Sequence, residues 1–503
     1  MILSKTGTAR SRGLHWRKPQ APQIESLPLP ELLKYPIATV QKQSANVLVE
    51  VGSKVLKGQP ITVSEDHNLV VTHASSSGVV SDISNRTITV KTDGIDKAVN
   101  TTSAAGAMSR QQLIRLAHRF GLTGHGGAGF PLAKKIASLP PNAELLLVNA
   151  AECDPLIHCD DALIKQHADD IIKALIIIAE SCNIKQTVIG IEDNKRESIT
   201  LLQQCLSVRP EKHNITIATI ASLYPSGAER LLLPLCTDKQ VPSYQSLASA
   251  GILSMNIASC FATGQALLQG LPPISRITTV VTSTGQVRNF KIRLGTPINH
   301  LVRHIEKKHP TSDQSISNLS ITVGGQMMNK PLTSQAAIDQ QSNCIAFSFP
   351  AELTPTIACI RCGACADVCP VGLMPQYLHK AAVHFNALLL DTLNLQHCIE
   401  CRCCDTVCPS SIPLTAQFSN AKAQQVKLGK EQLAADLAKQ RYDKRELRLQ
   451  KQQSGQGKKR LKDTTTKSSA QTRKDLIAQA LKRSAVKKPY RQSAKPPNNG
   501  SPG

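Results

Sequence analysis

Eight of the nine cysteines between residues 359 and 408 constrain this chain more than any other feature. They form two copies of one motif, C-x2-C-x2-C-x3-C-P. This spacing holds 4Fe–4S clusters, and the fourth cysteine of each motif binds the cluster of the other motif. The expected ligands are Cys359, Cys362, Cys365 and Cys408 for cluster one, and Cys398, Cys401, Cys404 and Cys369 for cluster two. Zinc is the chemical alternative, but zinc sites usually use two C-x2-C pairs and do not need the C-P ending.

The use of cysteine also bears on the compartment. The chain has 16 cysteines in 503 residues. Its first ten residues, MILSKTGTAR, lack the apolar region of a secretory signal peptide, and half of the cysteines have cluster spacing, so we expect a reducing compartment. The longest apolar run, residues 171–179, is interrupted by Lys173 and is far shorter than the roughly 20 residues that span a bilayer. We therefore expect no membrane-spanning segment.

The positive charge is concentrated at one end of the chain. Of the net charge of +23, residues 421–503 contribute +16, from 22 Lys and Arg against 6 Asp and Glu. A basic tail on a nearly neutral body indicates attraction to an acidic surface, such as an anionic membrane, a partner protein or RNA. The alternative is a solubilising, partly disordered tail. Aromatic residues, which stack on bases, make up only 3% of the chain, so no specific nucleic acid is expected.

Residues 36–105 have the pattern of a small β domain. Residues 1–35 before them form a Pro- and Arg-rich arm with little periodicity. From residue 36, short alternating runs are separated by Gly and Ser turns, which predicts a small sandwich or barrel. VGSKVLKGQP and HASSSGVV resemble the barrel-sandwich module of lipoyl and biotin carrier domains. Those carriers attach the cofactor to a hairpin lysine, whereas Lys54 and Lys57 lie in a different turn, so we expect a structural module.

A glycine-rich loop follows a predicted helix in residues 106–275. The loop, residues 121–136, reads GLTGHGGAGFPLAKKI. Glycines without a Cβ let the backbone approach a flat ligand or a phosphate closely. Pro131 suits the first turn of the next helix, which places the ammonium of Lys135 near the loop, where it can meet a phosphate. The alternative is a mobile loop without a ligand.

Polar residues follow a buried-type strand, 144–148, in the same region. The strand ends in NAAECDP, and in open α/β sheets ligands bind at the carboxyl ends of strands. Asn149 and Glu152 there can hydrogen-bond a ring edge or a ribose, with turn formation and helix capping as the alternative. The next predicted elements are strands 186–192 and 215–220 and helices 161–181, 194–206 and 228–236. Their alternation predicts a largely parallel, doubly wound sheet.

The rest of the chain adds three further parts. Residues 276–350 return to a strand pattern and predict a small α+β domain of β-grasp size. Residues 351–420 contain the cysteine motifs and predict a bacterial ferredoxin-like domain. By spacing Cys403 is not a ligand in it, and it is expected to pack as a small apolar side chain, with tuning of a cluster through a weak S–H hydrogen bond as the alternative. Residues 421–480 are helical in pattern but sparse in apolar positions, and the basic, low-complexity tail 421–503 is expected to end in disorder.

Taken in order, these parts resemble the C-subunit (RnfC) of the Rnf/Rsx electron-transport complex. The matching stretches are VGSKVLKGQP, HASSSGVV, GGAGFP, LLLVNAAECDP, VIGIEDNK, YPSGAER and the two cysteine motifs. The middle part is also similar to the flavin subunit of respiratory complex I. The likeness spans about residues 35–420 and implies an FMN/NADH-type α/β domain over residues 106–275. The whole is then a multidomain α/β and α+β protein, with a barrel-sandwich module, a β-grasp-like domain and a ferredoxin-like domain.

The resemblance also implies a set of residues around FMN and NADH. By motif they are Gly124, Gly126, Gly127, Gly129, Phe130, Lys135, Asn149, Glu152, Tyr224, Gly227, Glu229 and Asn256. On this basis Phe130 lies against the nicotinamide and Glu229 binds the ribose of NADH. The chain departs from the family at four places. Leu132-Ala133 replaces Thr-Gly, Asp154 replaces a Glu, Ala258-Ser259 replaces Gly-Thr, and the N-terminal histidine motif is only partly kept, as Gly13-Leu14-His15.

The resemblance implies a peripheral subunit on the cytoplasmic side of the bacterial inner membrane. Such a protein takes electrons from NADH through FMN to cluster one and cluster two, and on to membrane subunits of an ion-translocating, ferredoxin:NAD-type oxidoreductase. The departures around the flavin site leave a second hypothesis, an electron-relay and docking subunit that keeps the clusters but has a decayed flavin and NADH site. A third and weaker hypothesis is a redox sensor whose basic tail binds nucleic acid.

Overall fold

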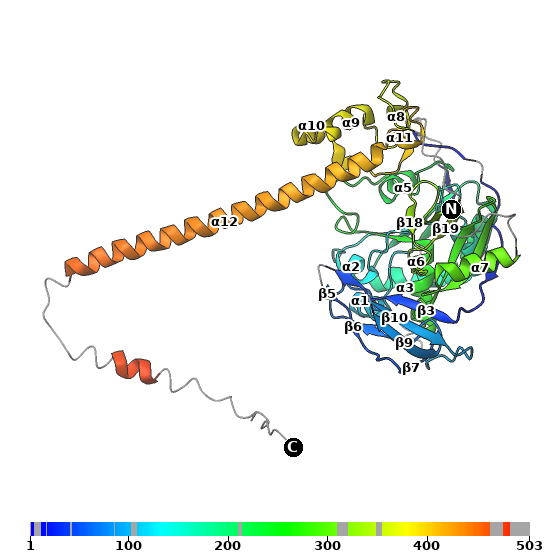
Figure 1. The fold of residues 1–503 in the computed structure, drawn as a ribbon, viewed down its shortest axis with the longest axis horizontal. Helices are drawn as coiled ribbons and strands as arrows, with labels where there is room; N and C mark the ends of the chain where they lie inside the picture. The colour runs from blue at the N-terminus through cyan, green and yellow to red at the C-terminus, as the bar shows by residue number, and fades with distance from the viewer. Residues whose placement is uncertain are drawn as a thin grey trace, which may run out of the picture. The chain divides into compact units, whose positions relative to one another are not determined.

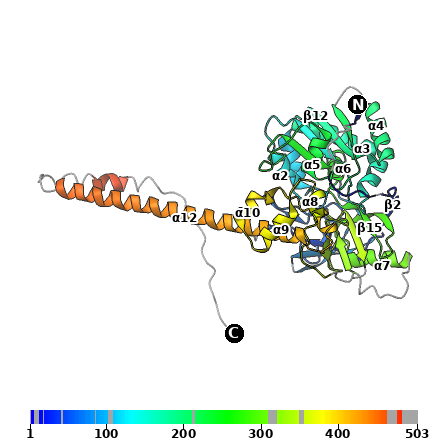
Figure 2. The same cartoon turned by 90° about the horizontal axis from the view of Figure 1, so that it is seen from above.

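The computed structural model (Figures 1 and 2) describes residues 2–4, 12–16, 18–40, 43–84, 86–101, 108–209, 214–308, 320–348, 355–462 and 476–482. The chain divides into two compact units, Met1–Lys422 and Ala423–Gly503. Three larger sheets and a group of short helices lie within the first unit. Among the residues described, no helix is both long enough and apolar enough to cross a bilayer.

A five-stranded parallel sheet lies at the centre of the domain that contains the glycine-rich loop. Its strands in order are β1 (Ile2–Ser4), β13 (Ile215–Ile220), β12 (Gln186–Glu192), β11 (Leu145–Asn149) and β14 (Ile252–Asn256). One face packs on α1 (Arg110–Arg119), α2 (Leu132–Ala137), α3 (Cys159–Cys182), α4 (Arg196–Ser207) and α6 (Ile257–Gln269), and the other on α5 (Glu229–Cys236). Neighbouring residues of β11 enter opposite cores, with Leu146 in the first and Leu147 in the second. The predicted doubly wound sheet is therefore confirmed.

The N-terminal β module is built from short antiparallel strands. Its main sheet has the order β3 (Leu32–Pro36), β10 (Thr87–Thr92), β9 (Gly78–Ser84) and β7 (Lys54–Val55). Two pairs complete it, β4 (Thr39–Val40) with β5 (Gln43–Ser44) and β6 (Asn46–Val47) with β8 (Thr62–Val63). Leu33, Ile61 and Ile88 are fully buried inside it. The ammonium of Lys57 pairs with Asp96 at 2.6 Å, which agrees with a structural role for this lysine.

A third sheet forms the predicted small α+β domain. Its order is β18 (Lys330–Leu332), β17 (Ser320–Val323), β19 (Cys344–Ser348), β15 (Ser275–Val281), β16 (Val287–Arg293) and β2 (Ile24–Ser26). The helix α7 (Ile298–Lys308) packs on it through Ile298 and Leu301, which are fully buried. The strand β2 belongs to the N-terminal arm, and the Glu25 carboxylate on it pairs with Arg288 at 2.9 Å. The arm, residues 1–35, therefore adds strands to all three larger sheets, as β1, β2 and most of β3, which its sequence pattern did not predict.

The cysteine motifs lie among short helices. These are α8 (Ala364–Asp367), α9 (Pro375–Val383), α10 (Ala387–Thr392), α11 (Cys403–Thr406) and the start of α12 (Leu414–Lys462). Leu378, Leu390 and Phe418 form their common core. Residues 426–452 of α12 are exposed throughout, as expected from their sparse apolar pattern. Much of the predicted disordered tail lies outside the described residues.

Gly121 gives a test of how closely the β module and the glycine-rich region pack. Its φ is +61°, and a Cβ would overlap the backbone carbonyl of Val71. Gly52 is a matched control, because its φ of +89° is also left-handed but no atom lies within 4 Å of the position that a Cβ would take. We expect G121A to lower the free energy of unfolding by more than about 2 kcal/mol, and G52A by about 1 kcal/mol from backbone strain alone. Denaturant unfolding measures both values, and equal losses would contradict the close contact.

Candidate functional site

The eight motif cysteines line two separate cavities. The outer set consists of Cys359, Cys362, Cys365 and Cys408, and the inner set of Cys369, Cys398, Cys401 and Cys404. In the outer set Cys359 and Cys362 are exposed, whereas three of the four cysteines in the inner set are buried. Each cavity thus receives three thiols from one motif and one thiol from the other. This is the combination that the spacing predicts, and ligation itself stays a prediction.

Both thiol sets depend on the same backbone turn. Arg361 and Gly363 in the first motif, and Glu400 and Arg402 in the second, have φ values between +56° and +82°. Two left-handed residues within three positions turn the chain sharply, so that successive thiols face one cavity. Three of the four are not glycine, so the surrounding structure offsets a cost of about 1 kcal/mol for each. Four thiols around one cavity are the donor set that a 4Fe–4S cluster takes, so the residues fit this cofactor.

The inner set lies against the region that precedes α5. The hydroxyl of Tyr224 donates a hydrogen bond of 2.9 Å to the carbonyl of Cys401. Tyr224, Cys401 and Met327 form one buried cluster with Cys403, whose side chain has no exposed surface. Cys403 therefore packs as a small apolar residue, as predicted. The same cluster places the inner set beside Tyr224, a residue that the family motif assigns to the flavin site.

The carboxyl ends of β11 and β14 bring two asparagines together. Asn149 and Asn256 are the last residues of these neighbouring strands and are paired in register. The Asn149 amide donates to the carbonyl of Gly227 at 2.8 Å. Gly126 lies on the other side of Asn256, and a Cβ on this glycine would come within 3.4 Å of the Asn256 Cβ. Four predicted site residues from four distant stretches of chain thus meet at the edge of the sheet where ligands bind.

The glycine-rich loop is closed by its own backbone. Gly124 donates to the carbonyl of Phe130 at 2.9 Å and accepts from the N–H of Gly129 at 3.1 Å. Gly127 and Gly129 have positive φ, which side chains rarely adopt. Phe130 is 44% exposed, so its ring is available to a ligand. The absence of a side chain at Gly126 keeps the space beside Asn256 open, which fits a flat ring such as that of FMN.

Lys135 and Glu229 lie at the same edge of the sheet. The ammonium of Lys135 pairs with the Glu229 carboxylate at 3.1 Å and donates to the carbonyl of Ser254 at 2.8 Å. Both side chains are partly exposed, so the pair lies within reach of solvent. Lys135 was predicted to meet a phosphate of FMN and Glu229 to bind the ribose of NADH, and the structure makes these two side chains direct neighbours.

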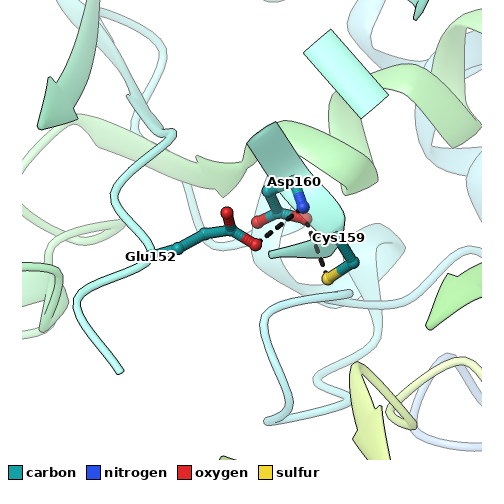
Figure 3. Close-up of side chains that lie close together, drawn as sticks. All are labelled: Glu152, Cys159 and Asp160. Carbon is teal, nitrogen blue, oxygen red and sulfur yellow. Dashed lines mark hydrogen bonds between the residues drawn. The ribbon is translucent and has the colours of Figure 1, made fainter. Parts of the chain in front are cut away.

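Glu152 is buried, and its side chain points toward Cys159 and Asp160 at the start of α3 (Figure 3). Its two carboxylate oxygens accept the backbone N–H groups of Asp160, at 2.7 Å, and Asp161, at 3.1 Å, at the start of α3. Burial acts to raise the pKa of Glu152, but the Lys195 ammonium, 3.6 Å away, holds it below its usual range. Helix capping, the alternative given for this residue, is what the structure shows.

Asp160 belongs to the site although the sequence did not predict it. One carboxylate oxygen accepts the amide of Asn256 at 2.6 Å. Ligand atoms of Glu152, Cys159 and Asp160 lie within 4.8 Å of one another (Figure 3). This group is not a convincing metal site, because Glu152 already caps α3 and pairs with Lys195. The only sequence signal for Asp160 was an acid at a helix start, which is common without a ligand.

The three departures from the family pattern around the glycine-rich loop and the strand ends are accommodated by packing and hydrogen bonds. Leu132 and Ala133 are buried in the core of the parallel sheet. Asp154 accepts the backbone N–H groups of Gln326 and Met327, both at 3.0 Å, and so ties the strand end to the third sheet. The Ser259 hydroxyl accepts the N–H of His125 at 2.8 Å. Each replacement thus has a structural partner within this chain.

Three family models match the chain. The RnfC barrel sandwich hybrid domain matches residues 12–102, the Nuo51 FMN-binding domain matches residues 117–264, and the 4Fe-4S dicluster domain matches residues 358–412. The chain therefore carries a barrel-sandwich module, an FMN-binding domain and a 4Fe–4S dicluster domain. The predicted fold class and the predicted cofactors, FMN and 4Fe–4S clusters, are confirmed.

Several curated relatives are named as the C-subunit of an ion-translocating oxidoreductase complex. The protein of Pasteurella multocida (strain Pm70) is 33% identical over 449 residues, which are 85% of this chain and 52% of the relative. That of Vibrio cholerae serotype O1 (El Tor Inaba N16961) is 35% identical over 498 residues, 93% of the chain and 62% of the relative. That of Haemophilus influenzae (strain PittEE) is 32% identical over 448 residues, 86% of the chain and 67% of the relative. The chain thus spans about half to two thirds of their length.

A solved structure of an NAD+-reducing NiFe-hydrogenase overlaps more loosely, with a TM-score of 0.40, 15% identity, and coverage of 60% of this chain and 53% of the other. That overlap is too loose to assign a family. The curated relatives match at 32–35% identity over most of the chain, and the match covers two thirds of the length of one of them. The chain belongs to the RnfC family, the family of the C-subunit of the ion-translocating oxidoreductase complex.

Proposed function

We propose that the chain is the electron-transfer subunit of a membrane-bound, ion-translocating oxidoreductase complex. It takes electrons from NADH through FMN to two 4Fe–4S clusters and passes them to membrane subunits of the same complex. The observation that carries the proposal is the 2.9 Å hydrogen bond from Tyr224, beside the strand ends, to Cys401 of the inner set. This contact joins the two cofactor regions within one chain.

In this proposal each thiol set holds one cluster, and FMN lies on the glycine-rich loop. Lys135 offers a cation to the phosphate, and the amides of Asn149 and Asn256 offer hydrogen bonds to the ring. When bound, FMN exchanges electron pairs with NADH and single electrons with the clusters. The exposed ring of Phe130 offers an apolar surface to the nicotinamide, and the Glu229 carboxylate offers an acceptor to the ribose.

The order of the two clusters follows from their burial. The inner set is mostly buried and touches Tyr224, so it receives electrons from the flavin region first. The outer set has exposed thiols at Cys359 and Cys362, so its cluster faces the next electron carrier. The proposed path therefore runs from the flavin to the inner set and then to the outer set. This order is the reverse of the order of the two motifs in the sequence.

The surrounding complex is inferred from the family. We place the chain at the cytoplasmic face of the bacterial inner membrane, as a peripheral partner of membrane subunits, with a ferredoxin-type carrier as the other redox substrate beside NADH. The exposed part of α12 and the tail are rich in Lys and Arg, which favours contact with anionic lipid. No specific nucleic acid is required.

Cofactor content of the anaerobically purified chain tests the proposal. We expect about eight iron atoms and eight sulfides per chain, an equimolar amount of FMN, and a flavin absorption band that NADH bleaches. Iron and sulfide at this level without FMN would instead support the second hypothesis, a relay and docking subunit with a decayed flavin site. Loss of the iron would overturn both.

A further inference from the structure

The buried carboxyl group of Asp160 is separated from the glycine-rich loop by a single side chain, that of Asn256. Asp160 is 6% exposed, and its carboxylate accepts the amide of Asn256 at 2.6 Å. Asn256 in turn lies against Gly126, where a Cβ would come within 3.4 Å. Asp160 therefore does not contact a ligand on the loop directly. It lies close enough to sense a change of charge there, because charges interact strongly in a buried site.

The groups around Asp160 come from four elements. Titratable or charged side chains that face it are Glu152 after β11, Cys159 in α3, Cys260 in α6 and Arg276 in β15. Burial, followed by the negative charge of Glu152, raises the pKa of Asp160 to about 7, and the Asn256 hydrogen bond and Arg276 oppose this rise. The guanidinium of Arg276 donates to the backbone carbonyls of Gln340 and His125 instead. Because Arg276 uses its hydrogen bonds on these carbonyls, the Asp160 carboxylate has no ion-pair partner in the described part of the chain that would hold it in the charged form.

We propose that Asp160 is a proton-holding residue of the flavin site, which takes up a proton when electrons arrive there and releases it when they leave. The inference rests on the proposed function. NADH gives up a hydride and becomes NAD+, which adds one negative charge to the site, and the Asp160 carboxylate binds one proton from solvent. The two electrons then leave one at a time for the clusters. The hydrogen of the hydride remains as a proton and leaves together with the proton of Asp160, so the net change is NADH to NAD+, two electrons and one proton.

A line of buried polar groups connects Asp160 with the surface. Glu152 caps the backbone N–H of Asp160 and lies 3.6 Å from the Lys195 ammonium. Glu192 is fully buried, and its charge interacts with those of Lys195 and Glu152. One of its carboxylate oxygens has no hydrogen-bond partner among the described residues. Its other oxygen accepts a hydrogen bond of 3.5 Å from the hydroxyl of Ser222, a partly exposed residue. Unpaired buried oxygens of this kind are usual places for ordered water, which can carry a proton inward.

The test compares Asp160→Asn with Asp160→Glu and with Asp169→Asn in the FMN-loaded chain. Asp169 is a matched control on the same helix, because its side chain is 47% exposed and pairs with Lys173 and Arg209. The flavin midpoint potential is measured from pH 5 to pH 9 by spectroelectrochemistry. At pH 9 the wild-type site holds a negative charge that D160N lacks, so D160N should have the more positive potential. At pH 5 both are neutral and the two potentials should coincide. D160E and D169N should follow the wild type.

Proton uptake on chemical reduction gives a second measurement that needs no variant. Above pH 7 the wild type should take up more protons per flavin than the flavin alone requires, and a pH-indicator dye measures this excess. The proposal is overturned if the difference in flavin midpoint potential between D160N and the wild type is the same at every pH, or if the wild type shows no excess proton uptake. Either result leaves FMN binding and flavin reduction by NADH unaffected. A wild type without bound FMN overturns the proposed function, and the role of Asp160 falls with it.

Discussion

Replacing Cys369 by serine is expected to remove the same cluster that is lost when Cys401 is replaced, although the two residues belong to different motifs. Both thiols line the inner cavity. Iron should fall from about eight to about four atoms per chain in each variant. The remaining cluster is then the outer one in both cases, so the two variants should share one residual electron paramagnetic resonance spectrum and one midpoint potential.

The mirror pair completes this test. Cys408→Ser and Cys362→Ser both empty the outer cavity, so they should share a second residual spectrum that differs from the first. Cys403→Ser is the control in the second motif, since Cys403 packs against Tyr224 and is not a predicted cluster ligand. It should keep about eight iron atoms. If Cys369→Ser instead matched Cys362→Ser, each motif would hold its own cluster and the crossed assignment would be wrong.

Local spacing explains why the thiol sets were predictable from the sequence. Three of the four thiols in each set come from one turn of seven residues, such as Cys359 to Cys365, so their meeting needs no knowledge of the fold. The same holds for β12 and β13, whose bounds agree with the predicted strands because each is a short local run rich in Val, Ile and Thr. The strand β2 was missed because three residues carry little pattern, and its partner β16 lies more than 260 residues away.

The flavin-type site was only partly predictable because its polar groups choose partners far away in the sequence. Glu152 and Asn149 lie at the end of the same strand, yet Glu152 turns inward to Lys195, which lies 43 residues later at the end of the stretch VIGIEDNK, and nothing in that stretch indicates this contact. Asp160 lies at a helix start, where an acid usually serves the helix dipole, so its contact with Asn256 has no sequence signal. A motif identified the region of the site, but the network of buried charges decided which side chain faces the loop.

Breaking the inner cluster is expected to disconnect NADH from the outer cluster without affecting the flavin. In Cys401→Ser, NADH should still bleach the flavin band, because the glycine-rich loop and strand ends contain none of the inner thiols. The outer cluster should stay oxidised after NADH is added and become reduced only by dithionite. Rapid-freeze electron paramagnetic resonance, which reports each cluster separately, measures both results in one experiment.

The reverse variant decides whether burial sets the direction of the path. In Cys359→Ser the inner cluster should be reduced by NADH as in the wild type, because Tyr224 still joins its loop to the flavin region. Electrons should then stop there, since the exposed relay is missing and an added soluble acceptor meets a mostly buried cluster. If NADH reduced the outer cluster in Cys401→Ser, and failed to reduce the inner cluster in Cys359→Ser, electrons would enter at the exposed thiols. The hydrogen bond between Tyr224 and Cys401 would then be a structural contact between the domains and not part of the electron-transfer path.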